Sequence, residues 1–246
     1  MGKKGILFGV GVGPGDPGLM TIKAVRKIEA VSVVSFPGDY REKSTAYSIA
    51  AAAVPGLDQK TLLPVPMPLS GGQAQWDAAA EKGAEAICHY LGKGQDAAYL
   101  TLGDPCIYST FFYLAREVEE RGYGTEVISG VPSFCAAAAR AKAPLVQREE
   151  ELRIIPALYG KDSIEDVFSQ KGNLVFMKSG KYAARLWDEA EKKGRETFFI
   201  ENCGMEGERI LKTPSPIPEQ AGYFTILFSR ERQDGKEGKE NESSHY

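Results

Sequence analysis

Cysteine and histidine are scarce in this sequence of 246 residues, which contains four cysteines and two histidines. No two cysteines form a C-x-x-C pair, so the sequence has neither the zinc-knuckle pattern nor the thioredoxin-like pattern. The histidines, His89 and His245, are too few for a histidine-rich metal site and argue against a histidine general base. We therefore expect no metal site, and we interpret the cysteines as reduced thiols of a cytoplasmic protein.

Long apolar runs and an excess of basic residues are also missing. No stretch reaches the roughly 18 uninterrupted apolar residues that a membrane-spanning helix needs. Glycines interrupt the first apolar run, at residues 5–13, which we interpret as a buried strand instead of a signal peptide. The formal net charge of −3 does not favour nucleic acid as a partner. We predict neither a membrane partner nor a nucleic acid partner.

Alternating strand and helix patterns fill the first half of the chain. The length and the 43% of hydrophobic residues are sufficient for a well-buried core. Strands are predicted at residues 5–13, 31–38, 96–105 and 124–130, and helices at 16–30, 44–54, 71–94, 107–122 and 131–141. A repeated strand and helix pattern indicates an α/β fold with a mainly parallel sheet.

A second α/β segment follows the proline and the charge run of residues 142–154. Strands are predicted at residues 152–160, 172–180, 195–204, 208–213 and 222–230, and helices at 163–171 and 182–194. No long helix separates the last two strands, which suggests an antiparallel edge. We predict domains at residues 1–143 and 153–231, and a disordered tail at 232–246 with almost no apolar residue.

The stretch GVGVGPGDPG, residues 9–18, has five glycines and two prolines directly after an apolar run. Residues 13–18 match the string G-x-G-x-x-G that opens dinucleotide-binding helices. Pro14 and Pro17 remove two backbone N–H donors, however, and Asp16 puts a negative charge where a pyrophosphate would bind. The loop is therefore predicted to approach a neutral or cationic ligand instead of a polyanion.

Two further strands end in loops of similar composition. TLGDPCIYST, residues 101–110, breaks a buried strand with Gly-Asp-Pro before a helix, and GVPS, residues 130–133, ends a third strand. Ligands bind at the carboxyl ends of strands in open α/β sheets. A capping aspartate and a turn glycine would explain either loop alone. The three loops together predict one shared site.

These motifs resemble the tetrapyrrole methylase family, the two-domain S-adenosylmethionine enzymes of cobalamin and siroheme synthesis. The resemblance rests on GVGPGDP, the GDP loop with the helix after it, SGVPSFCAAAAR and NLVFMKSGK, and it covers nearly the whole chain except the tail. Within the family, GDPCIYSTFFYL followed by VPSFCAAAAR is similar to the branch that methylates carbon 20 of precorrin-2 or its cobalt-containing counterpart.

The resemblance implies two α/β domains of the class III methyltransferase type, a homodimer, and S-adenosylmethionine bound folded in a cleft between the domains. S-adenosylhomocysteine would be the product. Carried over by motif, the cofactor contacts are Pro14, Leu102, Gly103, Asp104, Ile107, Pro132, Ser133, Met177 and Thr225. The chain departs from the family in the third loop, where relatives usually have threonine at the place of Pro132.

Methyl transfer from a sulfonium requires alignment of the reacting atoms and exclusion of water. Asp104 is the candidate for electrostatic or proton-handling help, with helix capping or cofactor binding as the alternative. Tyr108 is the candidate for contact with the macrocycle, with a core aromatic as the alternative. The tetrapyrrole substrate carries many carboxylates, so basic side chains are expected near it. The candidates are Arg41, Lys43, Arg148 and Lys178, each of which could instead be a solvated surface charge.

Other functions stay open at this point. A sister enzyme could methylate another tetrapyrrole carbon, namely C11, C17 or a position of uroporphyrinogen III, or the chain could be a diphthine synthase. A different class, an NAD(P)-dependent oxidoreductase or a nucleotide-binding module, is disfavoured by Pro14 and Pro17. It is also disfavoured because Phe36 and Pro37 stand where an acidic residue should end the second strand.

Overall fold

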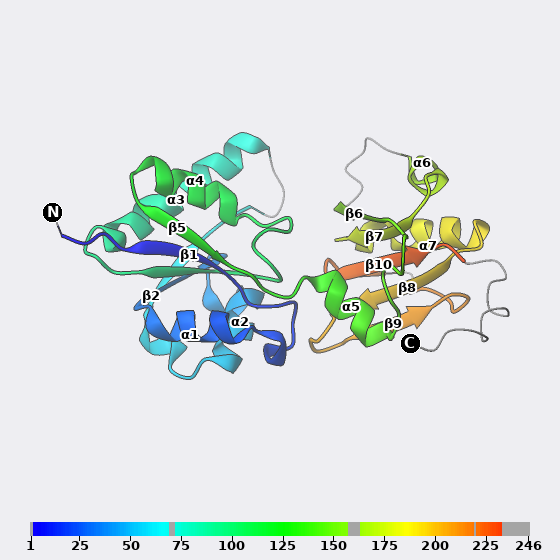
Figure 1. Cartoon of the computed structure of the whole chain (residues 1–246), viewed down its shortest axis with the longest axis horizontal. Coiled ribbons are helices and arrows are strands. Elements are labelled where there is room, and N and C mark those ends of the chain that lie inside the picture. Colours follow the sequence, from blue (N-terminus) through cyan, green and yellow to red (C-terminus); the bar gives the residue numbers. More distant parts are fainter. Residues whose placement is uncertain (1, 69–71, 157–162, 219, 233–246) are drawn as a thin grey trace, which may run out of the picture. The chain divides into compact units, whose positions relative to one another are not determined.

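The computed structural model describes residues 2–68, 72–156, 163–218 and 220–232 (Figure 1). The chain forms two compact units, of which the first contains Met1–Ala136 with Asn202–Glu206 and the second contains Ala137–Glu201 with Gly207–Tyr246. The domain ranges 1–143 and 153–231 stay predictions. The tail predicted to be disordered lies outside the described residues, apart from residue 232.

The first unit contains a five-stranded parallel sheet with the strand order β3-β2-β4-β1-β5 (Figure 1). The strands are β1 (Ile6–Gly11), β2 (Val33–Pro37), β3 (Thr61–Val65), β4 (Ala97–Thr101) and β5 (Gly124–Ile128). Because the strands run in one direction, their carboxyl ends share one edge, where β4, β1 and β5 are neighbours. The predicted parallel α/β arrangement is confirmed.

Helices cover both faces of this sheet (Figure 1). They are α1 (Ile22–Ala30) and α2 (Thr45–Ala53) on one face, and α3 (Gln73–Leu91) and α4 (Phe111–Glu120) on the other. Strand β1 serves both cores, since Val10 packs with α1 and α2 while Leu7 packs with α3 and α4. A Cβ at Gly9 would stand 2.6 Å from the ring of Phe111. The bare backbone at Gly9 therefore lets an aromatic ring of α4 pack directly on β1.

The first helical segment begins later than the sequence pattern predicts. Residues 16–30 divide into a single 3-10 turn at Pro17–Leu19, which Asp16 caps, and the helix α1. Thr21 separates them, because its backbone is extended and its hydroxyl accepts a hydrogen bond of 3.1 Å from an amide of the first turn of α1. The predicted capping role of Asp16 is confirmed, but for a turn instead of the long helix.

The second unit contains a mixed sheet with the strand order β6-β7-β10-β8-β9 (Figure 1). Its strands are β6 (Leu152–Pro156), β7 (Asn173–Met177), β8 (Glu196–Glu201), β9 (Arg209–Lys212) and β10 (Thr225–Arg230), and its helices are α6 (Ile164–Ser169) and α7 (Ala183–Lys192). The helix α5 (Ser133–Ala141) precedes β6 in the chain. None of the described helices has the length and apolar character needed to cross a membrane.

The expected antiparallel edge is present but contains only one of the last two strands. Strand β10 pairs antiparallel with β7 on one side and with β8 on the other, so it lies inside the sheet, while β9 forms the antiparallel edge. Nearly every residue of β10 is buried, including Thr225 and Ser229. The hydroxyl of Ser229 accepts hydrogen bonds from Arg195 (3.0 Å) and Thr197 (2.8 Å), which makes its burial tolerable.

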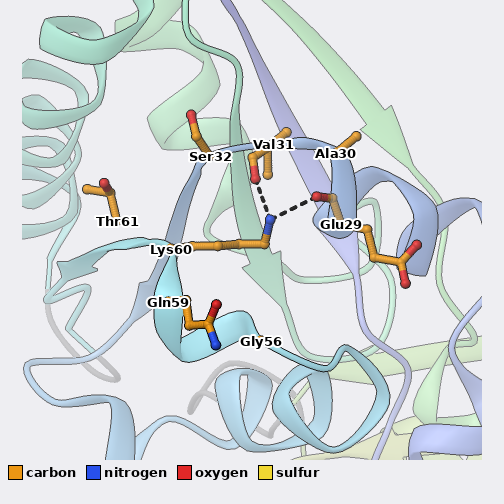
Figure 2. Close-up of a pocket in the computed structure, with 8 residues that line it drawn as sticks. All are labelled: Glu29, Ala30, Val31, Ser32, Gly56, Gln59, Lys60 and Thr61. Carbon is orange, nitrogen blue, oxygen red and sulfur yellow. Dashed lines mark hydrogen bonds between the residues drawn. The ribbon is translucent and has the colours of Figure 1, made fainter.

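A pocket opens at the amino ends of β2 and β3 in the first unit (Figure 2). Lys60 reaches across it and donates hydrogen bonds from Nζ to the carbonyl oxygens of Glu29 (2.8 Å) and Val31 (2.6 Å), at the end of α1. The ammonium group of Lys60 thus donates to carbonyl groups that are left unpaired at the end of α1, and its positive charge is favourable near the negative end of the helix dipole. We assign the pocket a structural role, since it lies at the amino ends of the parallel strands, opposite the loops that follow β1, β4 and β5.

Candidate functional site

The loops after β1 and β4 are joined by backbone hydrogen bonds at the carboxyl edge of the first sheet. Gly103 donates to the carbonyl of Gly13 over 2.8 Å, and Gly13 donates to the carbonyl of Gly103 over 3.2 Å. The amide of Val12 donates to the carbonyl of Thr101 over 2.9 Å. The parallel pairing of β1 and β4 therefore continues into an antiparallel bridge, which fixes the two loops relative to one another.

Three glycines meet where the loops after β1, β4 and β5 converge. A Cβ at Gly130 would stand 2.1 Å from the carbonyl oxygen of Gly103, and a Cβ at Gly11 would stand 2.6 Å from that oxygen and from the amide nitrogen of Gly130. Gly103 also has a φ of +73°, which other residues rarely adopt. We call these three residues the glycine junction. Their lack of side chains is what allows the three loops to touch.

Asp104 holds the second loop to the third. Its side chain is 8% exposed, and its Oδ1 accepts a hydrogen bond of 2.8 Å from the amide of Cys106. Its Oδ2 accepts one of 2.9 Å from the amide of Gly130, in the loop after β5. Bonds of this kind, to an ionised acceptor, are stronger than neutral ones. Both carboxylate oxygens thus stabilise the arrangement of the site.

The segment Asn202–Glu206, which follows β8 in the chain, belongs to the first unit and packs on the opening glycine loop. A Cβ at Gly15 would stand 2.3 Å from the carbonyl oxygen of Cys203 and 2.8 Å from the side chain of Met205. Pro14, a predicted cofactor contact, is buried in this loop. The absence of a side chain at Gly15 therefore lets the opening glycine loop pack against Cys203 and Met205. The sequence motif alone did not predict this contact.

Tyr108 projects from the loop between β4 and α4. Its side chain is 48% exposed, so the alternative of a core aromatic is wrong, and its φ of +48° lies in the left-handed region. Residues other than glycine occupy this region at an energetic cost, and such conformations cluster at functional sites. The end of the same loop is anchored, because Thr110 lies 3.1 Å from the buried hydroxyl of Tyr99 and the amide of Phe111 donates to Ser109.

The acidities of two groups near this loop differ from their ordinary values. Burial raises the pKa of Tyr99 to about 12, so its phenol stays neutral at physiological pH. Burial, and then the charge of Asp104, raise the pKa of the Cys106 thiol. Neither group is therefore a ready base or nucleophile. Among the described residues, no cluster of histidine, cysteine and carboxylate side chains could hold a metal ion.

The remaining predicted cofactor contacts lie on several elements. In the first unit, Leu102 and Ile107 are partly exposed on either side of Asp104. Pro132 and Ser133 are partly exposed at the start of α5. In the second unit, Met177 ends β7 and is buried, and Thr225 begins β10. The Thr225 side chain is fully buried and its hydroxyl donates to the carbonyl of Gly222 over 2.8 Å.

The four predicted substrate contacts are divided between the two units, with two in each. Arg41 and Lys43 follow β2 at the carboxyl edge of the first sheet. In the second sheet Lys178 follows β7, whereas Arg148 precedes β6, so these two residues lie at opposite edges of that sheet. The guanidinium of Arg41 is hydrogen-bonded to Glu42 (2.9 Å) and lies 3.7 Å from Asp58, and this raises its pKa. Two carboxylates thus already balance the charge of Arg41.

A sequence model of the Tetrapyrrole (Corrin/Porphyrin) Methylases matches residues 7–216, a range that includes all three loops of the candidate site. The chain belongs to this family. A protein of Methanocaldococcus jannaschii named "Probable cobalt-precorrin-2 C(20)-methyltransferase" is 34% identical to this tetrapyrrole methylase over 210 residues, which cover 83% of this chain and 86% of the relative. The cobalt-precorrin-2 C(20)-methyltransferase of Salmonella typhimurium is 30% identical over 238 residues, which cover 92% and 97%.

A solved structure supports the fold of this tetrapyrrole methylase. Uroporphyrin-III C-methyl transferase from Thermus thermophilus, complexed with S-adenosyl homocysteine, aligns with a TM-score of 0.64 and 20% identity, covering 92% of this chain and 98% of that one. At this level of identity the likeness shows the fold alone. The predicted fold class of two α/β units is thereby confirmed, with the correction that the second sheet is mixed.

We expect Gly130→Ala to lower the free energy of unfolding by about 1–3 kcal/mol, because its Cβ would overlap the carbonyl oxygen of Gly103. Urea unfolding of the ligand-free protein measures the change. Gly124→Ala is the matched control at the other end of β5, since its Cβ would stand 3.7 Å from Ile6, an ordinary contact. Equal stabilities of the two variants would contradict the close approach at the glycine junction.

We expect Asp104→Asn to lower the free energy of unfolding by about 1.5–3 kcal/mol, because the amide NH₂ cannot accept one of the two backbone hydrogen bonds. Thermal and urea unfolding without ligand measure this loss. Asp96→Asn is the control, since a single oxygen of Asp96 accepts the amide of Ile6 (2.9 Å), and an asparagine oxygen can still accept that bond. An Asp104 variant as stable as the Asp96 variant would refute the holding role.

Proposed function

We propose that this tetrapyrrole methylase transfers a methyl group from S-adenosylmethionine to carbon 20 of precorrin-2 or of its cobalt-containing counterpart, in cobalamin biosynthesis. The likeness to two proteins named C(20)-methyltransferases carries the proposal, because it extends over 83% and 92% of this chain. The loops after β1, β4 and β5 lie within the range that the family matches. S-adenosylhomocysteine is the second product of such a transfer.

The residues of the loops fit S-adenosylmethionine better than a dinucleotide. Pro14 and Pro17 offer no N–H groups to a pyrophosphate, while the bare backbone at Gly13 and Gly103 permits close approach. The hydroxyl of Thr101, directly before the second loop, is buried and has no hydrogen-bond partner among the described residues. Buried polar groups normally have a partner, so this hydroxyl is one that a bound ligand could satisfy.

The cofactor supplies a methyl group on a sulfonium sulfur, and the protein aligns the acceptor carbon with it and keeps water away. Leu102 and Ile107 are partly exposed apolar residues suited to the water-excluding wall. The exposed ring of Tyr108, on the same loop, is suited to contact with the macrocycle. Asp104 acts as a positioning residue, because both of its oxygens hold the loops in place.

The proposed contacts to substrate carboxylates are Lys43 and Lys178. Neither lysine belongs to any ion pair formed between the described residues, and each stands just after a strand at a carboxyl edge. Arg41 is a weaker candidate because of Glu42 and Asp58. Arg148 is a weaker candidate because it lies at the amino edge of the second sheet.

A homodimer in the cytoplasm completes the proposal. No disulfide joins Cys88, Cys106, Cys135 and Cys203, as expected in a reducing compartment. The family resemblance supports the homodimer, and sedimentation analysis of the purified protein would measure the oligomeric state.

Isothermal titration calorimetry tests the cofactor. We expect S-adenosylhomocysteine to bind at micromolar or lower concentration, and NAD(P) not to bind, because the first loop lacks the amide donors that a pyrophosphate needs. Gly124→Ala should bind S-adenosylhomocysteine like the unaltered protein, because it lies at the amino end of β5. Binding of NAD(P) without binding of S-adenosylhomocysteine would refute the methyltransferase proposal.

Incubation with methyl-labelled S-adenosylmethionine tests the reaction. The protein is supplied with precorrin-2 or with the cobalt-containing counterpart, and magnetic resonance of the product locates the label on the ring. We expect the labelled methyl at carbon 20. A label at another carbon, with the same cofactor, would keep the methyltransferase activity and overturn the proposed position.

A further inference from the structure

Lys178 and Tyr223 form a cation and ring pair at one edge of the second sheet. Lys178 directly follows β7, and Tyr223 stands two residues before β10, which pairs antiparallel with β7, so both lie at the carboxyl edge of β7 (Figure 1). The Nζ of Lys178 lies 5.6 Å from the centroid of the Tyr223 ring. The tyrosine is 44% exposed and the lysine is partly exposed. The ammonium group of Lys178 and the ring of Tyr223 are thus adjacent and both accessible to solvent.

The two segments that carry this pair are clamped to one another. The amide and the hydroxyl of Ser179 both donate to the carbonyl of Thr225, over 3.1 and 3.2 Å. A Cβ at Gly180 would stand 2.1 Å from the carbonyl oxygen of Gly222, so the backbones are in close contact. The buried carboxylate of Glu201 accepts a hydrogen bond from the amide of Gly222. The backbone segments that carry Lys178 and Tyr223 are therefore held to one another by several contacts.

Lys178 occupies a backbone conformation that does not suit a lysine. Its φ is +56°, in the left-handed region, where a residue with a Cβ is disfavoured and glycine is not. Such conformations persist where the surroundings impose them, and they cluster at ligand-binding sites. The clamp described above imposes this one. A lysine at a position that glycine would fit better points to a role for its side chain.

The charge of Lys178 is not balanced by the described part of the protein. No ion pair between described residues includes it, whereas Arg209 at the same edge pairs with Glu201, and Lys212 pairs with Glu196. Ammonium groups hydrogen-bond carboxylates, and tyrosine rings offer large contact area at a small cost in side-chain entropy. The pair therefore suits a ligand that has both a conjugated ring system and peripheral carboxylates.

We propose that Lys178 and Tyr223 form a substrate-recognition pair, in which the ammonium binds a peripheral carboxylate of the tetrapyrrole and the tyrosine ring packs against the macrocycle. This inference rests on the proposed function and extends it, because it assigns Tyr223 to the substrate and joins it with Lys178 in one recognition site. The pair determines how well the substrate binds. It takes no part in the chemical step.

Steady-state kinetics with precorrin-2 at saturating S-adenosylmethionine test the pair. We expect Tyr223→Leu and Lys178→Met each to raise KM about fivefold to tenfold and to leave kcat within twofold of the unaltered protein. Tyr223→Phe and Lys178→Arg should restore KM, because they keep the ring and the charge. Lys178→Gly should raise KM as Lys178→Met does, while its melting temperature is no lower, because glycine relieves the left-handed conformation.

Lys93→Met is the matched control. Lys93 lies 5.5 Å from the ring of Tyr90 in a similar pair, but at the end of α3 in the first unit, so KM should not change. Binding of S-adenosylhomocysteine, measured by calorimetry, should be equal in all variants. If the unaltered protein methylates precorrin-2 and the Lys178 and Tyr223 variants keep its KM, the pair is refuted and the proposed function stands. If the unaltered protein methylates no tetrapyrrole, both are refuted.

Discussion

The carboxylate of Asp104 connects two loops that are separated in the sheet by a whole strand. Its acceptor atoms join the loop after β4 to the amide of Gly130 after β5, and β1 lies between these strands. The connection therefore passes over the end of β1, at Gly11, where a side chain would collide with Gly103 and Gly130. A buried carboxylate is tolerable only because both oxygens are partnered. The hydrogen bond from Gly130 to Asp104 can form only because the glycine junction lets the loops after β4 and β5 meet over the end of β1.

Much of the first unit could be predicted from the sequence, because its elements are set by local patterns. The strands β1, β2 and β4 are buried, mainly apolar runs with a helix after each of them, a pattern that leads to parallel pairing. One exception is β3, which the pattern does not predict because Thr61 and Pro64 interrupt its apolar residues and are exposed. The other is the start of α1, where the hydroxyl of Thr21 competes with the predicted cap at Asp16. Single capping groups decide such boundaries, and periodicity does not resolve them.

The second sheet shows the limit of local patterns. The position of β10 between β7 and β8 depends on pairing over long sequence separations, and its apolar residues suit an edge or a centre equally. The buried partners of Ser229, from β8 and the residue before it, favour the centre. Similarly, the motifs identified the loops of the candidate site but not that Gly15 packs against Cys203. Chain order alone could have predicted that Arg148 and Lys178 lie at opposite ends of the second sheet's strands, since Arg148 precedes a strand and Lys178 follows one.

The packing of Asn202–Glu206 on the opening glycine loop has a consequence for the continuity of the first unit. That unit is built from two pieces of chain, and the 65 residues Ala137–Glu201 of the other unit stand between them. A fragment that ended at Ala136 would contain every strand of the parallel sheet and would still expose the surface of Gly15 that Cys203 and Met205 cover. The opening loop therefore cannot have its full set of contacts until residues 202–206, beyond β8, have been synthesised.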